Sequence, residues 1–207
     1  MRMKPRRLLA LAGVLAVAGC DGLAPPAAKS TVEYRPELAG TVDHAMCLLG
    51  FTATPLQRLL TGHQLVEGTL NGKPATFVLD TGANVSVVHA SHAEAFGLVP
   101  QRGVFGAAAG LGGALKATRS SIEGLRLGAI DIRQDHLMVA DLSQVERLLG
   151  RLSRTPIHGI IGQDVMREHH AVIDVARPML YMLDTGSAPA PVPAERCTRP
   201  ADKTQTP

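Results

Sequence analysis

The dipeptide Asn71-Gly72 is the feature of this sequence that most restricts its fold. It separates two runs rich in β-branched and large apolar residues, 64–70 and 75–79. Asn-Gly favours the positive φ angles of a tight hairpin turn, so the two runs predict a pair of antiparallel strands. More short strand-like runs follow at 85–88, 121–132, 136–140, 171–174 and 178–182.

Helical signals are confined to short stretches of the chain. Apolar residues at helical spacing follow Asp141, and a second short helix is expected over 164–169. Ser91 and Glu94 match a helix capping box, and Gly97 is suited to the end of a short helix. Many short strands with few helices predict a mostly β fold with two or three short helices.

The chain length limits the number of domains. With 207 residues, it can form one ordinary hydrophobic core with appendages. We expect this core domain over 62–184 and an N-terminal extension over 43–61, whose leucines could pack against the core or shield a site as a propiece. The tail, 185–207, contains five prolines and almost no large apolar residues, which is typical of a disordered segment.

The first residues have the pattern of a signal peptide, 1–19, followed by a tether, 20–42. A basic start precedes an apolar run, 8–17, that is too short to span a membrane. Val17-Ala18-Gly19-Cys20 resembles the lipobox of bacterial lipoproteins, which implies acylation of Cys20 and a membrane anchor facing the periplasm. By resemblance to enterobacterial sorting patterns, Asp21 slightly favours the inner membrane. An ordinary leader with an incidental cysteine is the alternative.

The net charge and the aromatic content argue against a nucleic-acid partner. The formal charge is +3, but 1–19 contain four basic residues and no acidic one, so the rest of the chain carries −1. Aromatic residues make up 3% of the chain and Trp is absent, which disfavours stacking on single-stranded nucleic acid.

Two cysteines remain besides Cys20, and they flank the expected core. In an oxidising compartment Cys47 and Cys197 could form a disulfide that holds the tail near the start of the domain. Two unpaired thiols are the alternative, since the sequence does not show their separation.

The segment from Phe77 to Ala83 is the best candidate for chemistry. Asp80 follows three large apolar residues, so its carboxylate should lie where a strand leaves the core, a setting that penalises the charged form. Thr81 offers a hydroxyl group, and Gly82 lets the chain turn without a side chain in the way. Taken alone, Asp80 would be interpreted first as a strand-end residue that caps a turn.

A series of motifs in this order resembles the bacterial retropepsin-like aspartic proteases, the single-domain aspartyl protease family, over about 65–183. The motifs are the hairpin around Asn71-Gly72, Asp80-Thr81-Gly82-Ala83, the Gly-rich segment 103–113, Leu125-Arg126-Leu127-Gly128, Gly159-Ile160-Ile161-Gly162-Gln163-Asp164 and Ala171-Val172-Ile173-Asp174. Gln163 and Val165-Met166 depart from the residues common in relatives and concern packing more than chemistry.

The resemblance implies a fold and a set of site residues. The fold would be a retropepsin-like closed β-barrel, the acid-protease fold as a single lobe. Asp80 would be catalytic, and the active-site loop would comprise Thr81, Gly82 and Ala83. The other implied residues are the loop support, Ile160, Ile161 and Gly162, and the substrate-binding flap, Gly110, Leu111, Gly112 and Gly113.

The implied activity is that of an aspartic endopeptidase. In a homodimer, Asp80 and the partner subunit's Asp80 would hold and activate one water molecule against a peptide or protein substrate, with no cofactor. A catalytically silent peptide-binding or scaffolding lipoprotein of the same fold is the alternative. Asp184-Thr185-Gly186 repeats the motif, but only 21 residues follow Gly186, too few for a second lobe, so we expect no catalytic role for Asp184.

Other chemistry-bearing residues have weaker support. His89 with His92, and His169 with His170, lack a further ligand at metal-binding spacing, so no metal site is expected. No serine lies in a Gly-x-Ser-x-Gly motif, which argues against a serine hydrolase. The glycines of 110–113 lack the strand and helix context of a nucleotide-binding loop.

Overall fold

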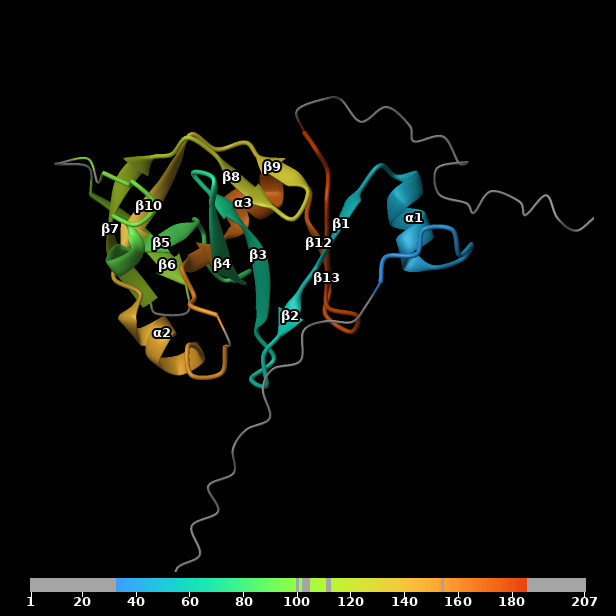
Figure 1. Ribbon diagram of the computed structural model, residues 1–207, viewed down its shortest axis with the longest axis horizontal. Coiled ribbons are helices and arrows are strands. Elements are labelled where there is room, and N and C mark those ends of the chain that lie inside the picture. The colour runs from blue at the N-terminus through green and yellow to red at the C-terminus, as the bar shows by residue number, and fades with distance from the viewer. Residues whose placement is uncertain (1–32, 100, 102–104, 111–112, 154, 186–207) are drawn as a thin grey trace, which may run out of the picture.

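The computed structural model describes residues 33–99, 101, 105–110, 113–153 and 155–185 (Figure 1). These residues form thirteen strands, three α-helices and one short 3₁₀ helix, which confirms the prediction of a mostly β fold with few helices. The predicted signal peptide, most of the tether and nearly all of the tail lie outside the described residues.

Most strands form one large sheet. Along its main path, the order is β6-β7-β10-β5-β11-β4-β3-β8-β9, and β2 pairs with β3. Their bounds are β2 Gln57–Arg58, β3 Gln64–Leu70, β4 Lys73–Leu79, β5 Val87–His89, β6 Phe105–Gly110, β7 Gly113–Ser121, β8 Leu125–Leu127, β9 Ile130–Ile132, β10 His136–Ala140 and β11 Gly159–Ile161. Within the described residues, the two end strands of this path, β6 and β9, do not pair with each other, so the closed barrel stays a prediction.

The hairpin predicted at Asn71-Gly72 is confirmed. β3 and β4 pair antiparallel from Gln64 opposite Leu79 to Leu70 opposite Lys73. Asn71 and Gly72 have φ angles of 49° and 73°. The Asn71 side chain also accepts a 2.8 Å hydrogen bond from the backbone N–H of Glu123, which ties this turn to the start of the next hairpin.

The core is divided between the two faces of the central strands. Along β4, Phe77 and Leu79 belong to one buried cluster, whereas Val78 belongs to the other. In β11, Ile161 and Ile160 are divided in the same way. Because side chains alternate along a strand, continuous apolar runs are needed where both faces are covered.

The helices are short, and α1 and α2 lie on opposite sides of the molecule (Figure 1). Their bounds are α1 Val42–Leu48, α2 Ser143–Leu149, α3 Gln163–Glu168 and the 3₁₀ helix Ala90–His92. The predicted capping box is wrong, because the 3₁₀ helix begins before Ser91 and its cap, His89, makes no side-chain capping bond. Gly97 does take a positive φ angle, 70°, where this segment ends.

A second, three-stranded sheet joins the two ends of the described chain. It contains β1 Thr52–Pro55, β12 Val172–Asp174 and β13 Met179–Met182, in the order β1-β13-β12. β1 pairs antiparallel with β13, from Thr52 opposite Met182 to Pro55 opposite Met179. Residues of the predicted N-terminal extension thus complete this sheet, which lies beside the large sheet together with α1 (Figure 1).

Candidate active site

Asp80 lies directly after β4, at the point where this central strand leaves the core. Its exposed fraction is 9%, and its backbone N–H donates a 3.1 Å hydrogen bond to the carbonyl oxygen of Ile161 in the neighbouring β11. The strand pairing therefore continues one residue past Leu79 and fixes the backbone from which the carboxylate projects. This is the strand-end position that the sequence predicted.

The loop after Asp80 folds back on its carboxylate. The backbone N–H of Gly82 donates a 2.9 Å hydrogen bond to Asp80 Oδ1. The Ala83 N–H donates to the Asp80 carbonyl oxygen at 3.1 Å, which closes a tight turn. A Cβ atom at Gly82 would lie 3.2 Å from Oδ1, so glycine lets the backbone approach the carboxylate closely. Thr81 and Gly82 are exposed, whereas Ala83 is buried.

The predicted support segment lies against this loop. Ile160 and Ile161 of β11 pair with Val78 and Leu79 of β4 in parallel register. The Cβ that Gly162 lacks would lie 2.7 Å from the carbonyl carbon and oxygen of Val85. The structure thus brings Ile160, Ile161 and Gly162 together with the Asp80 loop, although they lie about 80 positions later in the sequence.

A polar clamp, formed by Ser86 and Asp164, holds the end of the loop. Asp164 Oδ1 accepts a 2.7 Å hydrogen bond from Ser86 Oγ, and Oδ2 accepts a 2.9 Å bond from the Ser86 N–H. Ser86 Oγ in turn accepts the Gly162 N–H at 2.9 Å. Sequence reasoning did not assign this clamp, since a serine and an aspartate 78 positions apart carry no local signal of their pairing.

Gln163 adds a further connection between the loop and the start of α3. Its backbone N–H donates to the Ala83 carbonyl oxygen at 2.9 Å, and its side-chain Nε2 donates to the Thr81 carbonyl oxygen at 2.6 Å. These bonds satisfy polar backbone groups at an exposed turn. The residue that departs from the expected family pattern therefore has a specific role in positioning the loop.

The Gly-rich segment forms a long hairpin, as predicted. β6 and β7 pair antiparallel up to Gly110 opposite Gly113. Leu111 and Gly112, the other two residues of the predicted flap, lie outside the described residues. β7 continues into the large sheet by pairing with β10, so the hairpin extends outward from a fixed base. Its role as a substrate-binding flap stays a prediction.

Asp184 lies in a different environment. It follows β13 in the three-stranded sheet and is exposed. Its neighbour Thr185 offers its carbonyl oxygen to the Arg133 side chain at 3.1 Å. Gly186 is outside the described residues.

The histidines of the core occupy structural positions. Buried His89 accepts the Leu142 N–H at Nδ1, at 3.2 Å, and its Nε2 lies 3.3 Å from Glu146 Oε2. His158 accepts the Thr76 N–H at 3.0 Å, and burial together with nearby His92 lowers the pKa of His158. Among the described residues, no group of three His, Cys, Asp or Glu side chains is arranged to hold a metal ion.

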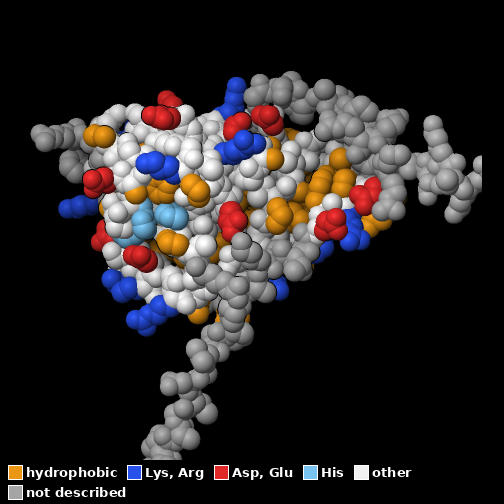
Figure 2. Space-filling view, in the orientation of Figure 1, with side chains coloured by type: hydrophobic (Ala, Val, Ile, Leu, Met, Phe, Trp, Pro, Cys, Tyr) orange, Lys and Arg blue, Asp and Glu red, His pale blue; other side chains and the backbone are white. Residues whose placement is uncertain are grey.

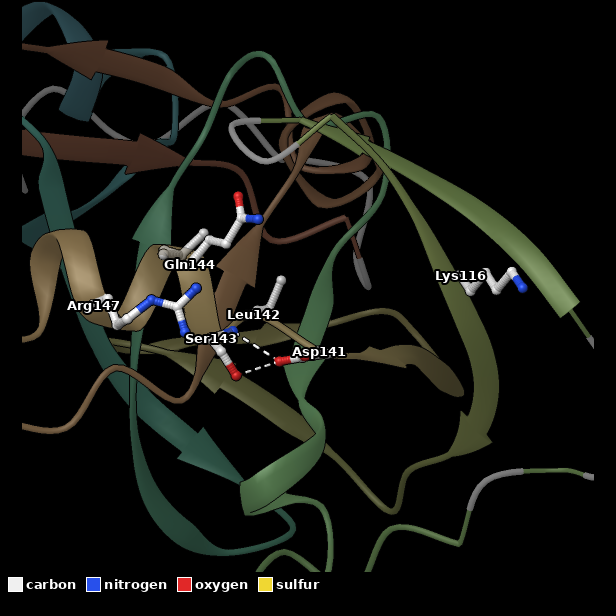
Figure 3. A pocket seen from close by; sticks show the side chains of 7 residues that line it. Lys116, Asp141, Leu142, Ser143, Gln144 and Arg147 are labelled. Carbon is white, nitrogen blue, oxygen red and sulfur yellow. Dashed lines mark hydrogen bonds between the residues drawn. The ribbon is translucent and has the colours of Figure 1, made fainter.

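A pocket of about 350 Å³ lies between β7 and the start of α2 (Figure 3). Two basic residues, Lys116 and Arg147, and one acidic residue, Asp141, contribute to its lining. Asp141 accepts hydrogen bonds from the hydroxyl and the N–H of Ser143, and these bonds lower its pKa. Asp80 does not line this pocket, which is therefore separate from the Asp80 carboxylate.

Of the three cysteines, Cys47 alone lies within the described residues. Cys47, at the end of α1, is disulfide-bonded. Cys20 and Cys197 both lie outside the described residues, so the pairing of Cys47 with Cys197 stays a prediction, as does acylation of Cys20. No helix within the described ranges is long and apolar enough to cross a membrane.

Solved structures similar to this chain include three proteases or protease-like domains. A retropepsin-like aspartic protease from Rickettsia conorii is 14% identical with a TM-score of 0.39, covering 64% of this chain and 89% of that one. EIAV protease complexed with the inhibitor HBY-793 is 20% identical with a TM-score of 0.36, covering 53% and 89%. The retroviral protease-like domain of Ddi1 from Leishmania major is 19% identical with a TM-score of 0.40, covering 60% and 88%.

No curated protein matches the chain. A sequence family described as Aspartyl protease matches residues 66–165. The matched range contains most of the first hairpin, the Asp80 loop, the Gly-rich hairpin, the Ile160-Ile161-Gly162 segment and Asp164. The part of the chain that builds the candidate site is therefore the part that matches the aspartyl protease family.

Proposed function

We propose that this protein is an aspartic endopeptidase whose active form is a homodimer. The observation that carries the proposal is the buried Asp80, whose carboxylate accepts the Gly82 N–H within a loop braced by β11 and α3. Within the described residues, one chain contains one such loop. A two-fold axis would bring it together with the identical loop of a second copy, so that the site is complete only in the dimer.

The chemistry requires the two carboxyl groups to share one proton. Two negative charges only a few ångströms apart repel strongly, so one group stays protonated while the other is ionised. The ionised group takes a proton from the water as the water oxygen attacks the peptide carbonyl carbon, and the protonated group donates a hydrogen bond to the carbonyl oxygen. Collapse of the tetrahedral intermediate then breaks the C–N bond as the leaving nitrogen takes up the proton that the carboxylate removed from the water, which returns the pair of carboxyl groups to its starting state.

The hairpin β6–β7 is the proposed substrate clamp. A peptide bound in extended form next to this hairpin would form backbone hydrogen bonds as an added strand. The glycines at 106, 110 and 113 reduce side-chain hindrance along the hairpin, which suits closure over a peptide. The broad class of substrate is therefore an unfolded segment of a protein or a peptide.

A mixing experiment tests the shared site. Wild-type protein and Asp80→Asn are co-refolded at one constant total protein concentration with an increasing fraction of the variant, and cleavage of a denatured protein is measured at mildly acidic pH. If both carboxyl groups of a dimer are required, equal amounts should leave about a quarter of the activity, because only wild-type pairs are active. A fall to about one half would show that each chain acts alone and would overturn the dimeric site.

The alternative function is peptide binding without cleavage. It would be supported if wild-type protein cleaves no substrate from acidic to neutral pH while peptides still bind. Fluorescence anisotropy measures peptide binding to wild-type protein and to Asp80→Asn. Binding without cleavage indicates a silent binding module, whereas loss of both indicates a misfolded preparation.

We also propose that the chain is exported and anchored through acylated Cys20 in a bacterial membrane facing the periplasm, with the inner membrane slightly favoured by Asp21. The support is the order of a basic start, an apolar run and Val17-Ala18-Gly19-Cys20. Mass spectrometry of the mature N-terminus tests this directly. A free, unmodified Cys20 or cleavage elsewhere would contradict it.

A further inference from the structure

The helix α1 buries its acidic residue, Asp43, and exposes apolar side chains. Val42, Ala45 and Leu49 are exposed, Val42 and Leu49 by 45% and 63%, while Asp43 is only 3% exposed. A surface helix ordinarily buries its apolar stripe and exposes its charged residues. In α1 this arrangement is reversed. Two questions follow: what stabilises the buried Asp43, and what covers the apolar stripe formed by Val42, Ala45 and Leu49.

The buried charge is explained by a network on the inner side of α1. Asp43 Oδ2 lies 3.1 Å from Arg177 Nη1, and Asp43 Oδ1 accepts a 2.5 Å hydrogen bond from the hydroxyl of the buried Tyr181 in β13. Arg177 also pairs with Asp174 at 2.8 Å. These bonds fix the rotation of α1 on the three-stranded sheet. If the helix turned about its axis, Arg177 and Tyr181 would lose their carboxylate partner, Asp43.

The outer side then presents a continuous apolar stripe. At 100° per residue, Ala45, Leu49, Val42 and Met46 fall within an arc of about 100°, and none of them is charged. Leu38, in the loop before α1, is also 46% exposed. Figure 2 shows hydrophobic side chains gathered over α1, on the part of the molecule farthest from α2.

The chain before α1 indicates what covers this stripe. Val42 lies 22 residues after Cys20, and only residues 21–32 separate that cysteine from the first described residue. A segment of 12 residues spans at most about 40 Å when fully extended, so a lipid anchor at Cys20 would keep α1 within reach of the membrane surface. The tether holds the apolar stripe close to the lipid surface, so its effective concentration there is high. A short stripe that would bind lipid weakly by itself can then remain bound.

We propose that α1 docks on the lipid surface, with Val42, Ala45 and Leu49 entering the interface. The inference rests on the Cys20 anchor but not on protease activity. Binding is driven by apolar burial, because the stripe contains no basic residue to attract anionic lipids. Docking would orient the domain so that α2 and the base of the β6–β7 hairpin face away from the membrane (Figure 1).

The absence of tryptophan makes a direct test possible. Leu49→Trp introduces a single probe on the stripe, and Leu148→Trp, at a residue of α2 that is 62% exposed, is the matched control. The mature chain, starting at residue 20 with an N-terminal hexahistidine tag, is attached to phosphatidylcholine vesicles containing a nickel-chelating lipid. This attachment supplies the tether whether or not Cys20 is acylated.

The expected result is an emission shift to shorter wavelength at position 49 on attachment, with quenching by brominated acyl chains. Neither change should occur at position 148. A second stripe probe, Val42→Trp, repeats the measurement if Leu49→Trp fails to fold. Unshifted, unquenched emission at position 49 would overturn the proposal. A blue shift without bromine quenching would also overturn it, because the stripe would then be covered by protein, either a second copy or another segment of this chain.

Discussion

The two Asp-Thr-Gly tripeptides of this chain have the same sequence and different surroundings. Asp80 is 9% exposed, and a second segment, Ile160 to Asp164, packs against its loop. Asp184 is exposed and follows β13, which belongs to the other sheet. A distant glycine, Gly162, and the Ser86–Asp164 clamp hold the turn at Asp80 in place, which makes this tripeptide the candidate site.

The largest expected difference between the two tripeptides is in catalysis. Asp80→Ala should lower kcat/KM for peptide cleavage by at least about 100-fold, because it removes the proposed acid and base from both halves of the dimer. Asp184→Ala should change the activity less than about two-fold, since an exposed side chain outside the site is replaced. A large loss in the Asp184 variant would contradict our assignment, and circular dichroism would check that both variants fold.

The Ser86–Asp164 clamp should contribute the next largest effect. Asp164→Ala leaves the buried Ser86 hydroxyl and N–H without their carboxylate partner, so the free energy of unfolding should fall by about 1–3 kcal/mol. Asp141→Ala is the matched control, because Asp141 also accepts two bonds from a serine but is exposed to water. Urea denaturation compares them, and equal losses would show that the clamp is not specifically stabilising.

Gly162 offers a steric test of the support beneath the Asp80 loop. In Gly162→Ala the new Cβ would lie 2.7 Å from the Val85 carbonyl group, so the loop must shift at a cost of about 1–2 kcal/mol. Gly124→Ala is the control, since a Cβ there meets no atom within 4 Å. Thermal unfolding and kcat/KM are measured for both variants. If the Gly162 variant behaves like the control, the close packing is not required.

The smallest expected effect is on the pH dependence of the free energy of unfolding, through a histidine that contacts β4. His158 accepts the Thr76 N–H of β4, and burial lowers its pKa below the 6.5 of a free histidine. The unfolded chain therefore binds more protons as the pH falls through about 6.5, so this residue should reduce stability progressively on acidification. The loss ends once the pH is below the lowered pKa of the folded state.

His158→Asn retains a hydrogen-bond acceptor for Thr76 and removes the titrating ring. We expect a weaker decline in the free energy of unfolding from about pH 7.5 to about pH 5.5 than in wild type. Hydrogen exchange should locate the difference in β4, which leads to Asp80, and not in β13, which leads to Asp184. An unchanged pH slope would exclude His158 as its source.

Local sequence signals determined several elements. Asn71-Gly72 specified the hairpin, because few dipeptides adopt two successive positive φ angles so readily. The apolar run before Asp80 predicted the strand β4, and the spacing after Asp141 predicted α2. These features depend on residues close together in the chain. The motif series around Asp80 likewise led to the family that residues 66–165 match.

Tertiary structure decided which polar residues meet. Ser86 and Asp164 pair across 78 positions, and Asp43 pairs with Arg177 across 134 positions. No local periodicity encodes such contacts, because they depend on how sheets and helices pack. For the same reason the sequence of α1 did not reveal that its apolar stripe faces outward. That orientation follows from a buried carboxylate whose partners lie on the last strands of the domain.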